Sequence, residues 1–367
     1  MTKVNYLYKL LIILIVLSPF VSQATTYQTF EISGWIPYWR TATGTADTLP
    51  HLDQLTEINP FGYTVRKNGG LVDMAKLTEA PWPEFLATAR AKKVRVIPSV
   101  MWSDSASIHK ILKNPISRSA HITEIVSRVE TYNFDGIDID YEAKWAETRP
   151  YFSQFLKELY ARMGKKWVMC TIEARTPLAD RYDTIPVTAP EYANDFVAIN
   201  KYCDRVRFMT YDQGRIDLRL NASSTDPYAP ISDPRWVEKT IKEALKTIPA
   251  RKIALGIPTY GYEWTYTPNP VNGNTYDLLW SFNPSYALDV ANAYGASIGR
   301  TVSGELSFSY KPTTTSPFAS NSIRVMTWPD AQSIKDKVDL AKRLGIRGVA
   351  VFKFDGGEDQ GMWDVLR

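Results

Sequence analysis

The chain has 367 residues, enough for one large domain with an insertion. Its formal net charge is +4, and about +2 remains without Lys3 and Lys9 of the N-terminal segment. No basic cluster stands out, so we expect no nucleic-acid partner. Two cysteines are too few for a disulfide scaffold.

Residues 1–24 have the pattern of a secretory signal peptide. Lys3 and Lys9 make a positive start, residues 10–17 are apolar, and Ser22 and Ala24 are small residues suited to cleavage. The apolar run is shorter than an ordinary membrane span, although an uncleaved anchor is the alternative. We therefore expect a mature chain of residues 25–367 that is secreted, periplasmic or at the cell surface, monomeric and free of the membrane.

Short apolar strands alternate with longer helical patterns, which is typical of a parallel sheet with crossover helices. Eight such units predict an α/β fold, a (β/α)₈ TIM barrel. The expected helices lie near 81–92, 107–131, 149–163, 188–201, 234–248 and 330–344. The expected strands lie near 31–36, 57–64, 94–101, 134–141, 166–173, 205–211, 252–257 and 347–353.

One interval interrupts this alternation. Roughly seventy residues rich in Pro, Gly, Asn, Ser, Thr and Tyr separate the strand at 252–257 from the helix at 330–344. A structureless loop of that length is improbable in a compact domain. We therefore predict a small inserted subdomain over about 260–327, α+β or β-rich, between strand seven and helix seven.

The two cysteines lie near different predicted strands. Cys170 is inside an apolar strand, and Cys203 precedes the next one. Export would permit a disulfide, but the sequence does not show whether the two residues meet at bridging distance. We expect two separate buried thiols.

Residues 134–142, Phe-Asp-Gly-Ile-Asp-Ile-Asp-Tyr-Glu, alternate acidic and apolar side chains, the period of a strand. Asp138, Asp140 and Glu142 therefore share one face, with two isoleucines and a tyrosine on the other. Same-face neighbours lie roughly 7 Å apart, so three full charges in a partly desolvated site are costly and at least one pKa should rise. A carboxylic acid held protonated near neutral pH is what glycosidic bond cleavage requires. We interpret the strand as catalytic.

Two other interpretations of this strand are weaker. A calcium loop needs polar residues and a turn glycine between its ligands, whereas Ile and Tyr stand between these carboxylates. A solvated acidic face is disfavoured because the Ile-rich flanks indicate a strand buried on at least one side. We expect no metal ion and no cofactor.

The stretch resembles the D-x-x-D-x-D-x-E motif of glycoside hydrolase family 18, the chitinase-like enzymes, at Asp135, Asp138, Asp140 and Glu142. In this family the substrate assists its own cleavage. The resemblance implies that Glu142 protonates the leaving oxygen and that Asp140 orients the attacking N-acetyl group. It also implies that Asp138 exchanges a proton with Asp140. Asp135, at the start of the strand, is expected to be a structural hydrogen-bonder.

A second match lies at the end of the strand at 205–211, where residues 209–212, Met-Thr-Tyr-Asp, resemble the family's M-x-Y-D motif. The hydroxyl of Tyr211 could hydrogen-bond the acetamide, and Asp212 could hold a sugar hydroxyl or amide. Met209 is expected to contact the substrate, with core packing as the alternative. Residues 256–261 resemble the segment that leads into the insertion of deep-cleft family members.

Four tryptophans follow predicted strands, at the end of the barrel where barrel enzymes place their chemistry. Flat aromatic side chains cover the apolar faces of sugar rings with a large contact area. Ordinary packing is the alternative for each one. We predict that they line an extended polysaccharide groove: Trp39, Trp102, Trp145 and Trp264.

Two positions depart from the family pattern. Ser99 is followed by Val100, Met101 and Trp102, where many chitinases have a Ser-x-Gly-Gly element. Phe352 stands in the last strand where a Trp commonly lies beneath the cleaved sugar. Because Phe offers less area, it should leave room for a bulkier ring such as N-acetylmuramic acid, which favours peptidoglycan over chitin.

We therefore expect a secreted, retaining glycoside hydrolase that cleaves β-linked N-acetylglucosamine polymers, peptidoglycan or chitin, through the substrate's N-acetyl group. An endo-N-acetylglucosaminidase acting on glycoproteins is one alternative, which the insertion disfavours because it suggests a walled groove for a linear polymer. A non-hydrolytic carbohydrate-binding protein on the same barrel is another. Such relatives typically lose the acid, whereas Glu142 is present.

Overall fold

The computed structural model describes residues 29–187, 191–216, 227–312 and 323–366. The predicted signal peptide, 1–24, lies outside the described residues. In the part of the chain that is described, no helix combines the length and apolar character needed to cross a membrane.

The parallel strands close into a barrel because β1 pairs with both the last strand, β15, and the second, β2. The order around the barrel is β1-β15-β9-β8-β7-β6-β5-β2, with the short β4 also paired to β2 and β3 added antiparallel to it. The predicted (β/α)₈ fold class is confirmed. The strands are β1 (Glu31–Pro37), β2 (Glu57–Val65), β3 (Leu71–Asp73), β4 (Arg95–Val96), β5 (Ser99–Trp102), β6 (Gly136–Tyr141), β7 (Trp167–Glu173), β8 (Arg205–Met209), β9 (Ile253–Pro258) and β15 (Gly348–Phe352).

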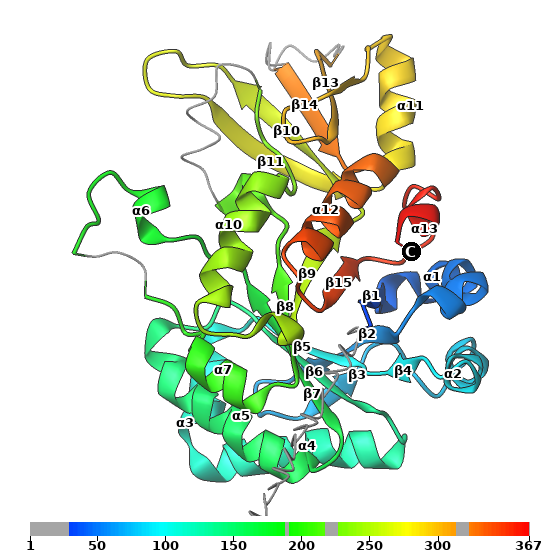
Figure 1. The fold of residues 1–367 in the computed structure, drawn as a ribbon, viewed down its shortest axis with the longest axis vertical. Helices are drawn as coiled ribbons and strands as arrows, with labels where there is room; N and C mark the ends of the chain where they lie inside the picture. The colour runs from blue at the N-terminus through cyan, green and yellow to red at the C-terminus, as the bar shows by residue number, and fades with distance from the viewer. Residues whose placement is uncertain (1–28, 188–190, 217–226, 313–322, 367) are drawn as a thin grey trace, which may run out of the picture.

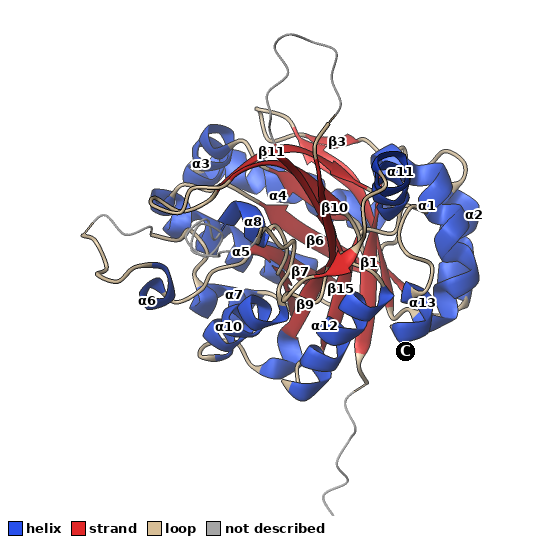
Figure 2. Ribbon diagram, turned by 90° about the horizontal axis from the view of Figure 1, so that it is seen from above, coloured by secondary structure: helices blue, strands red, loops and turns tan. Residues whose placement is uncertain are grey.

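Helices lie around the outside of these strands (Figures 1 and 2). Several begin after an Asp or Asn whose side chain accepts hydrogen bonds from first-turn N–H groups. The helices are α1 (Thr41–Thr48), α2 (Trp82–Ala91), α3 (Ser105–Lys113), α4 (Pro115–Thr131), α5 (Arg149–Met163), α6 (Leu178–Arg181), α7 (Phe196–Tyr202), α8 (Gln213–Ile216), α10 (Pro234–Leu245), α12 (Ala331–Arg343) and α13 (Met362–Val365), with 3-10 turns at Tyr38–Arg40, Leu49–Gln54, Ala146–Thr148 and Ala250–Lys252.

Several predicted boundaries are wrong. The helix expected at 107–131 is two helices, because Asn114 caps a new helix that has Pro115 at its first position. The helix expected at 188–201 begins only after its cap, Asp195; residues 188–190 lie outside the described part. The third strand, expected at 94–101, is divided into β4 and β5.

The cysteines form a disulfide, which corrects the expectation of two separate thiols. Cys170 lies on the helix-facing side of β7, and Cys203 follows α7, just before the neighbouring strand β8. Their Cα atoms are 6.0 Å apart, within bridging range. The parallel pairing of β7 with β8 brings the two residues together, and sequence spacing alone does not show this.

The segment between β9 and α12 forms a five-stranded antiparallel sheet with one helix. The strand order is β11-β10-β14-β13-β12, and the sheet stands above β9 and β15 at the top of Figure 1. A separate apolar cluster, which includes Phe282, Ala287, Ala291, Phe308 and Trp328, joins α11 to the sheet. The elements are β10 (Gly261–Thr267), β11 (Thr275–Phe282), α11 (Pro284–Tyr294), β12 (Gly299–Arg300), β13 (Leu306–Tyr310) and β14 (Ile323–Trp328).

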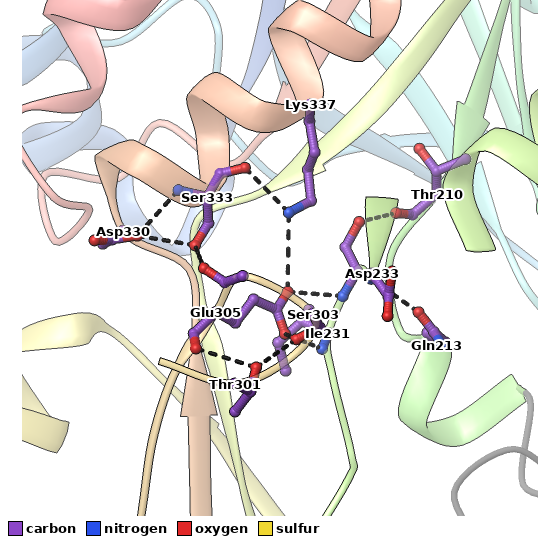
Figure 3. A network of polar contacts seen from close by, with 12 residues as sticks. Thr210, Gln213, Ile231, Asp233, Thr301, Ser303, Glu305, Asp330, Ser333 and Lys337 are labelled. Atoms are coloured by element: carbon purple, nitrogen blue, oxygen red, sulfur yellow. Dashed lines mark hydrogen bonds and ion pairs between the residues drawn. The ribbon is translucent and has the colours of Figure 1, made fainter. Parts of the chain in front are cut away.

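A buried ion pair fastens this sheet to the barrel (Figure 3). The Glu305 carboxylate, just before β13, lies 4.0 Å from Nζ of Lys337 on α12, and both side chains are fully buried. Glu305 also accepts hydrogen bonds from the backbone N–H groups of Ile231 and Ser232, each 2.8 Å long. Lys337 donates to the carbonyl of Ser333. One carboxylate thus links the inserted sheet, α12 and the loop that precedes α10.

Replacing Lys337 by Met should leave Glu305 buried without its counter-ion. Breaking a buried pair typically costs about 3–5 kcal/mol of unfolding free energy, and we expect the lower end because Glu305 keeps two backbone donors. The loss is measured by urea denaturation followed by fluorescence. Lys335→Met on the same helix removes only an exposed pair with Asp339 and should leave the unfolding free energy nearly unchanged. Similar losses in both variants would contradict the role given to the buried pair.

The loop after β15 places a second buried carboxyl group beside α1. Glu358 accepts hydrogen bonds from the backbone N–H groups of Asp355, at 3.1 Å, and Gly357, at 2.9 Å. Burial, together with the neighbouring Asp47 carboxylate, raises the pKa of Glu358 from 4.5 to about 8. The folded chain therefore holds Glu358 as the neutral acid at pH 7.

This raised pKa predicts a pH dependence of stability. Folding raises the proton affinity of Glu358. The stabilisation that comes from its protonated form is therefore fully present below about pH 4.5 and is lost as the pH rises towards 8. We expect this group to lower the unfolding free energy by about 2–4 kcal/mol across that window. Glu358→Gln should remove this part of the slope, whereas Glu130→Gln, an exposed control on α4, should keep it. Urea midpoints at several pH values test this, and an unchanged slope in Glu358→Gln would contradict it.

Candidate active site

Strand β6 brings the acidic residues to the C-terminal mouth of the barrel. Asp138 and Asp140 point into the interior and are buried, and Glu142, one residue beyond the strand, is partly exposed. The N–H of Glu142 donates to the carbonyl of Trp102 at 2.8 Å, so the pairing with β5 continues past the strand end. At the opposite end of the strand, the Asp135 carboxylate accepts a hydrogen bond from the backbone N–H of Val96 on β4, at 2.7 Å. That contact fits its expected structural role.

Asp138 is surrounded by donors inside the barrel. Its Oδ2 accepts hydrogen bonds from Ser99 Oγ at 2.5 Å and Trp35 Nε1 at 3.1 Å, and its Oδ1 accepts one from Thr171 Oγ1 at 2.8 Å. Burial raises the pKa of Asp138, and these hydrogen bonds oppose the rise. Nη1 of Arg207 lies 3.2 Å from Oδ1 and adds a positive charge that favours the ionised form.

Asp140 has a contrasting environment. It is 3% exposed, and Oδ1 has no hydrogen-bond partner among the described residues. Burial first, and then the carboxylates of Glu142 and Asp138, raise the pKa of Asp140 well above its usual range. These surroundings favour the ionised form of Asp138, which has donors that stabilise a carboxylate, and the protonated form of Asp140.

Glu173, which the sequence analysis did not select, ends the adjacent strand β7. Its Oε1 accepts the N–H of Ala143 at 2.9 Å, and its Oε2 accepts Nδ2 of Asn194 at 2.6 Å. Ala143 has a left-handed backbone, φ 53°, a strained conformation for a residue other than glycine. Glu173 thus holds the turn that immediately follows Glu142, and its charge also contributes to the raised pKa of Asp140.

Lys144 is the second charged residue that the sequence analysis did not select. Its side chain is 1% exposed, and its Nζ lies 3.5 Å from Oε2 of Glu173 and donates to the carbonyl of Tyr141. Its positive charge opposes the rise in the pKa of Asp140. Lys144 and Glu173 therefore fix the backbone on both sides of Glu142.

Residues 209–212 lie at the same mouth. Strand β8 ends at Met209, so Tyr211, expected within the strand at 205–211, belongs with Asp212 to the loop after it. Tyr211 is buried, and burial raises its pKa well above the usual range, which keeps the hydroxyl neutral. Its ring stacks on Phe352 with centroids 5.8 Å apart. Gly256 of β9 permits this position, because a Cβ there would lie 2.7 Å from the Tyr211 ring.

Asp212 joins the barrel to the inserted sheet. Its Oδ1 accepts the hydroxyls of Tyr260, at 2.5 Å, and Tyr262, at 2.6 Å. Its backbone is left-handed, with φ 60°, a conformation that Asp tolerates better than most residues. Met209 is partly buried and packs against the aromatic cluster that contains Tyr211, Tyr260 and Tyr262.

Phe352 lies at the base of the mouth, among aromatic rings from several strands. Its ring centroid lies 5.9 Å from that of Trp35, 5.6 Å from that of Phe61 and 5.8 Å from that of Tyr211. A cavity of about 380 Å³ opens beside it, and Trp39 and Asp212 also line this cavity. Such a volume holds a sugar-sized group.

The four predicted groove tryptophans divide into two pairs. Trp39 and Trp145 are 49% and 44% exposed at the mouth, so their proposed contact with a glycan stays a prediction. Trp102 is 4% exposed and packs between His121 and Tyr141, because it shares the helix-facing side of its strand with Tyr141. Trp264 is 2% exposed in the cluster that joins β10 to the barrel. The expectation that Trp102 and Trp264 line the groove is therefore wrong.

The described residues contain no group of three or more His, Cys, Asp and Glu side chains arranged to hold a metal ion. Asp138, Asp140, Glu142, Tyr211, Asp212 and Phe352 do gather at one mouth. The arrangement can supply a partly exposed acid, a buried neutral carboxyl group and an aromatic ring on which a sugar can stack. This combination suits cleavage of a sugar chain.

Comparisons with known proteins identify relatives of this chain. Among curated relatives, the uncharacterized glycosylase YvbX of Bacillus subtilis is 23% identical over 312 residues, covering 83% of this chain and 82% of YvbX. The cortical fragment-lytic enzyme of the same organism is 27% identical over 307 residues, which is 82% of this chain and 64% of that enzyme.

Two solved structures share the fold. The spore cortex-lytic enzyme SleL of Bacillus megaterium aligns with a TM-score of 0.69 at 20% identity, over 92% of this chain and 73% of SleL. A chitinase of Chromobacterium violaceum aligns with a TM-score of 0.71 at 19% identity, over 92% of this chain and 98% of the chitinase. The family model "Glycosyl hydrolases family 18" matches residues 32–357, so this chain belongs to that family, as the motif at 135–142 indicates.

Proposed function

We propose that this family 18 glycoside hydrolase cleaves polymers that contain N-acetylglucosamine by substrate-assisted catalysis, and that its natural polymer is peptidoglycan. The observation that carries the proposal is the contrast between the two buried aspartates. Asp138 is held by three hydrogen bonds and a cation, whereas Asp140 has an unpartnered oxygen, among the described residues, next to Glu142.

In the proposed reaction, Glu142 gives its proton to the glycosidic oxygen as the C1–O bond breaks. The carbonyl oxygen of the substrate's acetamide forms the new bond to C1, which gives a cyclic oxazolinium ion. Asp140 accepts the acetamide N–H, and its own proton passes to Asp138 as positive charge develops. Water then attacks C1 and gives a proton to Glu142 while the C1–O bond to the acetamide oxygen breaks, and the proton returns from Asp138 to Asp140. Two displacements at C1 leave the product with its original anomeric configuration.

Tyr211 and Phe352 complete this scheme. The neutral Tyr211 hydroxyl donates to the acetamide carbonyl and holds it towards C1, a positioning effect. Phe352 covers the apolar face of the same sugar. Export through residues 1–24 would bring the enzyme to an extracellular or periplasmic polymer.

The choice of peptidoglycan rests on Phe352 and on the relatives. Phe in place of Trp beneath the cleaved sugar leaves more room around an N-acetylglucosamine whose two neighbours are the bulkier N-acetylmuramic acid. Similarity to a cortical fragment-lytic enzyme supports the same choice. Chitin is the second candidate, because a chitinase that aligns with this chain along 98% of its own length has the same fold. The presence of Glu142 disfavours a non-hydrolytic sugar-binding protein.

Replacing Glu142 by Gln should lower kcat by roughly 10²–10⁴-fold, because the leaving oxygen would lose its proton donor. Release of reducing ends from purified glycan strands measures turnover, and circular dichroism checks the fold. Glu130→Gln, an exposed change at the opposite end of the barrel, should behave as wild type. Near wild-type turnover in Glu142→Gln would falsify the assignment of the acid.

Substrates without the N-acetyl group should be cleaved at least roughly 10³-fold more slowly, since an oriented intramolecular nucleophile has an effective molarity of about 10⁵ M or more. The comparison uses acetylated and N-deacetylated chitooligosaccharides of equal length, with NMR to follow the product anomer. Asp140→Asn should be nearly as damaging as Glu142→Gln. Comparable rates on both oligomers, or a trapped sugar–carboxylate adduct, would exclude this mechanism.

A further inference from the structure

Two basic side chains meet one carboxylate beside Phe352. Asp355 is buried, forms an ion pair with Nζ of Lys353, and lies 3.7 Å from Nε of Arg40. Nδ2 of Asn283, from the inserted sheet, donates to the same carboxylate at 3.1 Å. Arg40, Lys353, Asp355 and Asn283 all line the cavity next to Phe352.

The charges in this group do not cancel. Lys353 is 12% exposed and is held by both Asp355 and Oδ1 of Asn283, at 2.9 Å. The Arg40 side chain is 49% exposed, and within the described ranges no group accepts a hydrogen bond from its guanidinium. Glu358, next to Asp355, has its pKa raised to about 8 by burial and by the Asp47 carboxylate on α1, and neither of these two residues lines the cavity. Arg40 therefore presents a positive charge to the solvent-filled space.

A second cavity, of about 560 Å³, continues from Arg40 along the inserted sheet. It shares Arg40 and Asn283 with the first cavity, and none of its lining residues is acidic. Trp280, 49% exposed, and Tyr286 also line this second cavity. The space thus offers an aromatic face for a ring and a cation for an anionic substituent. Asp212, which lines only the first cavity, is already bound by two tyrosine hydroxyls.

We propose that Arg40 binds a carboxylate carried by the glycan, on the sugar next to the one above Phe352. This inference rests on the proposed function. In a chain that alternates N-acetylglucosamine and N-acetylmuramic acid, both neighbours of a cleaved N-acetylglucosamine are muramyl sugars. Their lactyl groups end in a free carboxylate or in a stem peptide with carboxylates of its own. Chitin has no such group.

The side-chain type suits this role. An arginine guanidinium is planar and donates two parallel hydrogen bonds to a carboxylate, which adds geometric selectivity to charge attraction. The contact at Asp355 keeps Arg40 near the cavity without using its outer donors, as far as the described residues show. Because Arg40 is half-exposed, we expect its contact to contribute roughly tenfold in kcat/KM.

The test compares three glycans: peptide-free strands with lactyl carboxylates, the same strands after carbodiimide coupling to methylamine, and peptide-bearing strands. Neutralising the carboxylates should lower wild-type kcat/KM about tenfold, mainly through KM. Arg40→Gln should show the same loss on untreated strands and no further loss after coupling. Arg343→Gln, an exposed arginine on α12, is the matched control and should respond as wild type does. An Arg40 effect confined to peptide-bearing strands would assign the carboxylate to the stem peptide.

The inference and the proposed function fail in different ways. If coupling lowers kcat/KM equally in wild type and Arg40→Gln, or lowers it in neither, Arg40 does not bind the carboxylate. Cleavage that depends on Glu142 is unaffected by that result. If wild type cleaves chitooligosaccharides but none of the three strands, both the peptidoglycan assignment and this site are overturned. Turnover that survives Glu142→Gln overturns the proposed function on its own.

Discussion

Burial of charge inside the barrel is the constraint on which the site depends. Asp138 is fully buried and remains acceptable there because Arg207, Ser99, Thr171 and Trp35 surround it. Arg207 in turn pairs with the buried Glu57. Burial lowers the pKa of Arg207 to about 9, so it stays cationic at neutral pH. With Asp138 stabilised in this way, protonation is favoured on Asp140, the next aspartate along β6, so the two carboxyl groups have different environments.

The inserted sheet depends on a second buried charge. Glu305 holds the loop before α10 and the helix α12 together, and this fixes the sheet above β9 and β15. Tyr260, next to β10, and Tyr262 on that strand can then reach Asp212. From β11 onwards the sheet supplies Trp280 and Asn283 to the cavities beside Phe352. The distant ion pair thus decides which surface a glycan would meet beyond the barrel mouth.

The alternation of side chains between the two faces of a strand explains both the predictions that were correct and those that were wrong. Along residues 134–142 the alternation is local, so the inward face of Asp138 and Asp140 could be read from the sequence. The same parity places Trp102 beside Tyr141 on the helix side, and counting along β5 would have shown it. On β7 it places Glu173 inward, two residues after Thr171, which pairs with Asp140. Both orientations follow from position along the strand, which residue type alone does not show.

The sequence by itself determined the barrel, the strand that carries the family motif and the family, because hydrophobic periodicity and motif spacing are local properties of the chain. Only the tertiary structure decided what lies between elements. The disulfide of Cys170 with Cys203 follows from the pairing of β7 with β8, and the burial of Trp264 follows from where the inserted sheet rests. The meeting of Arg40 and Asp355, 315 residues apart, needs the closure of β1 onto β15. Such contacts depend on the path of the whole chain, which no local pattern encodes.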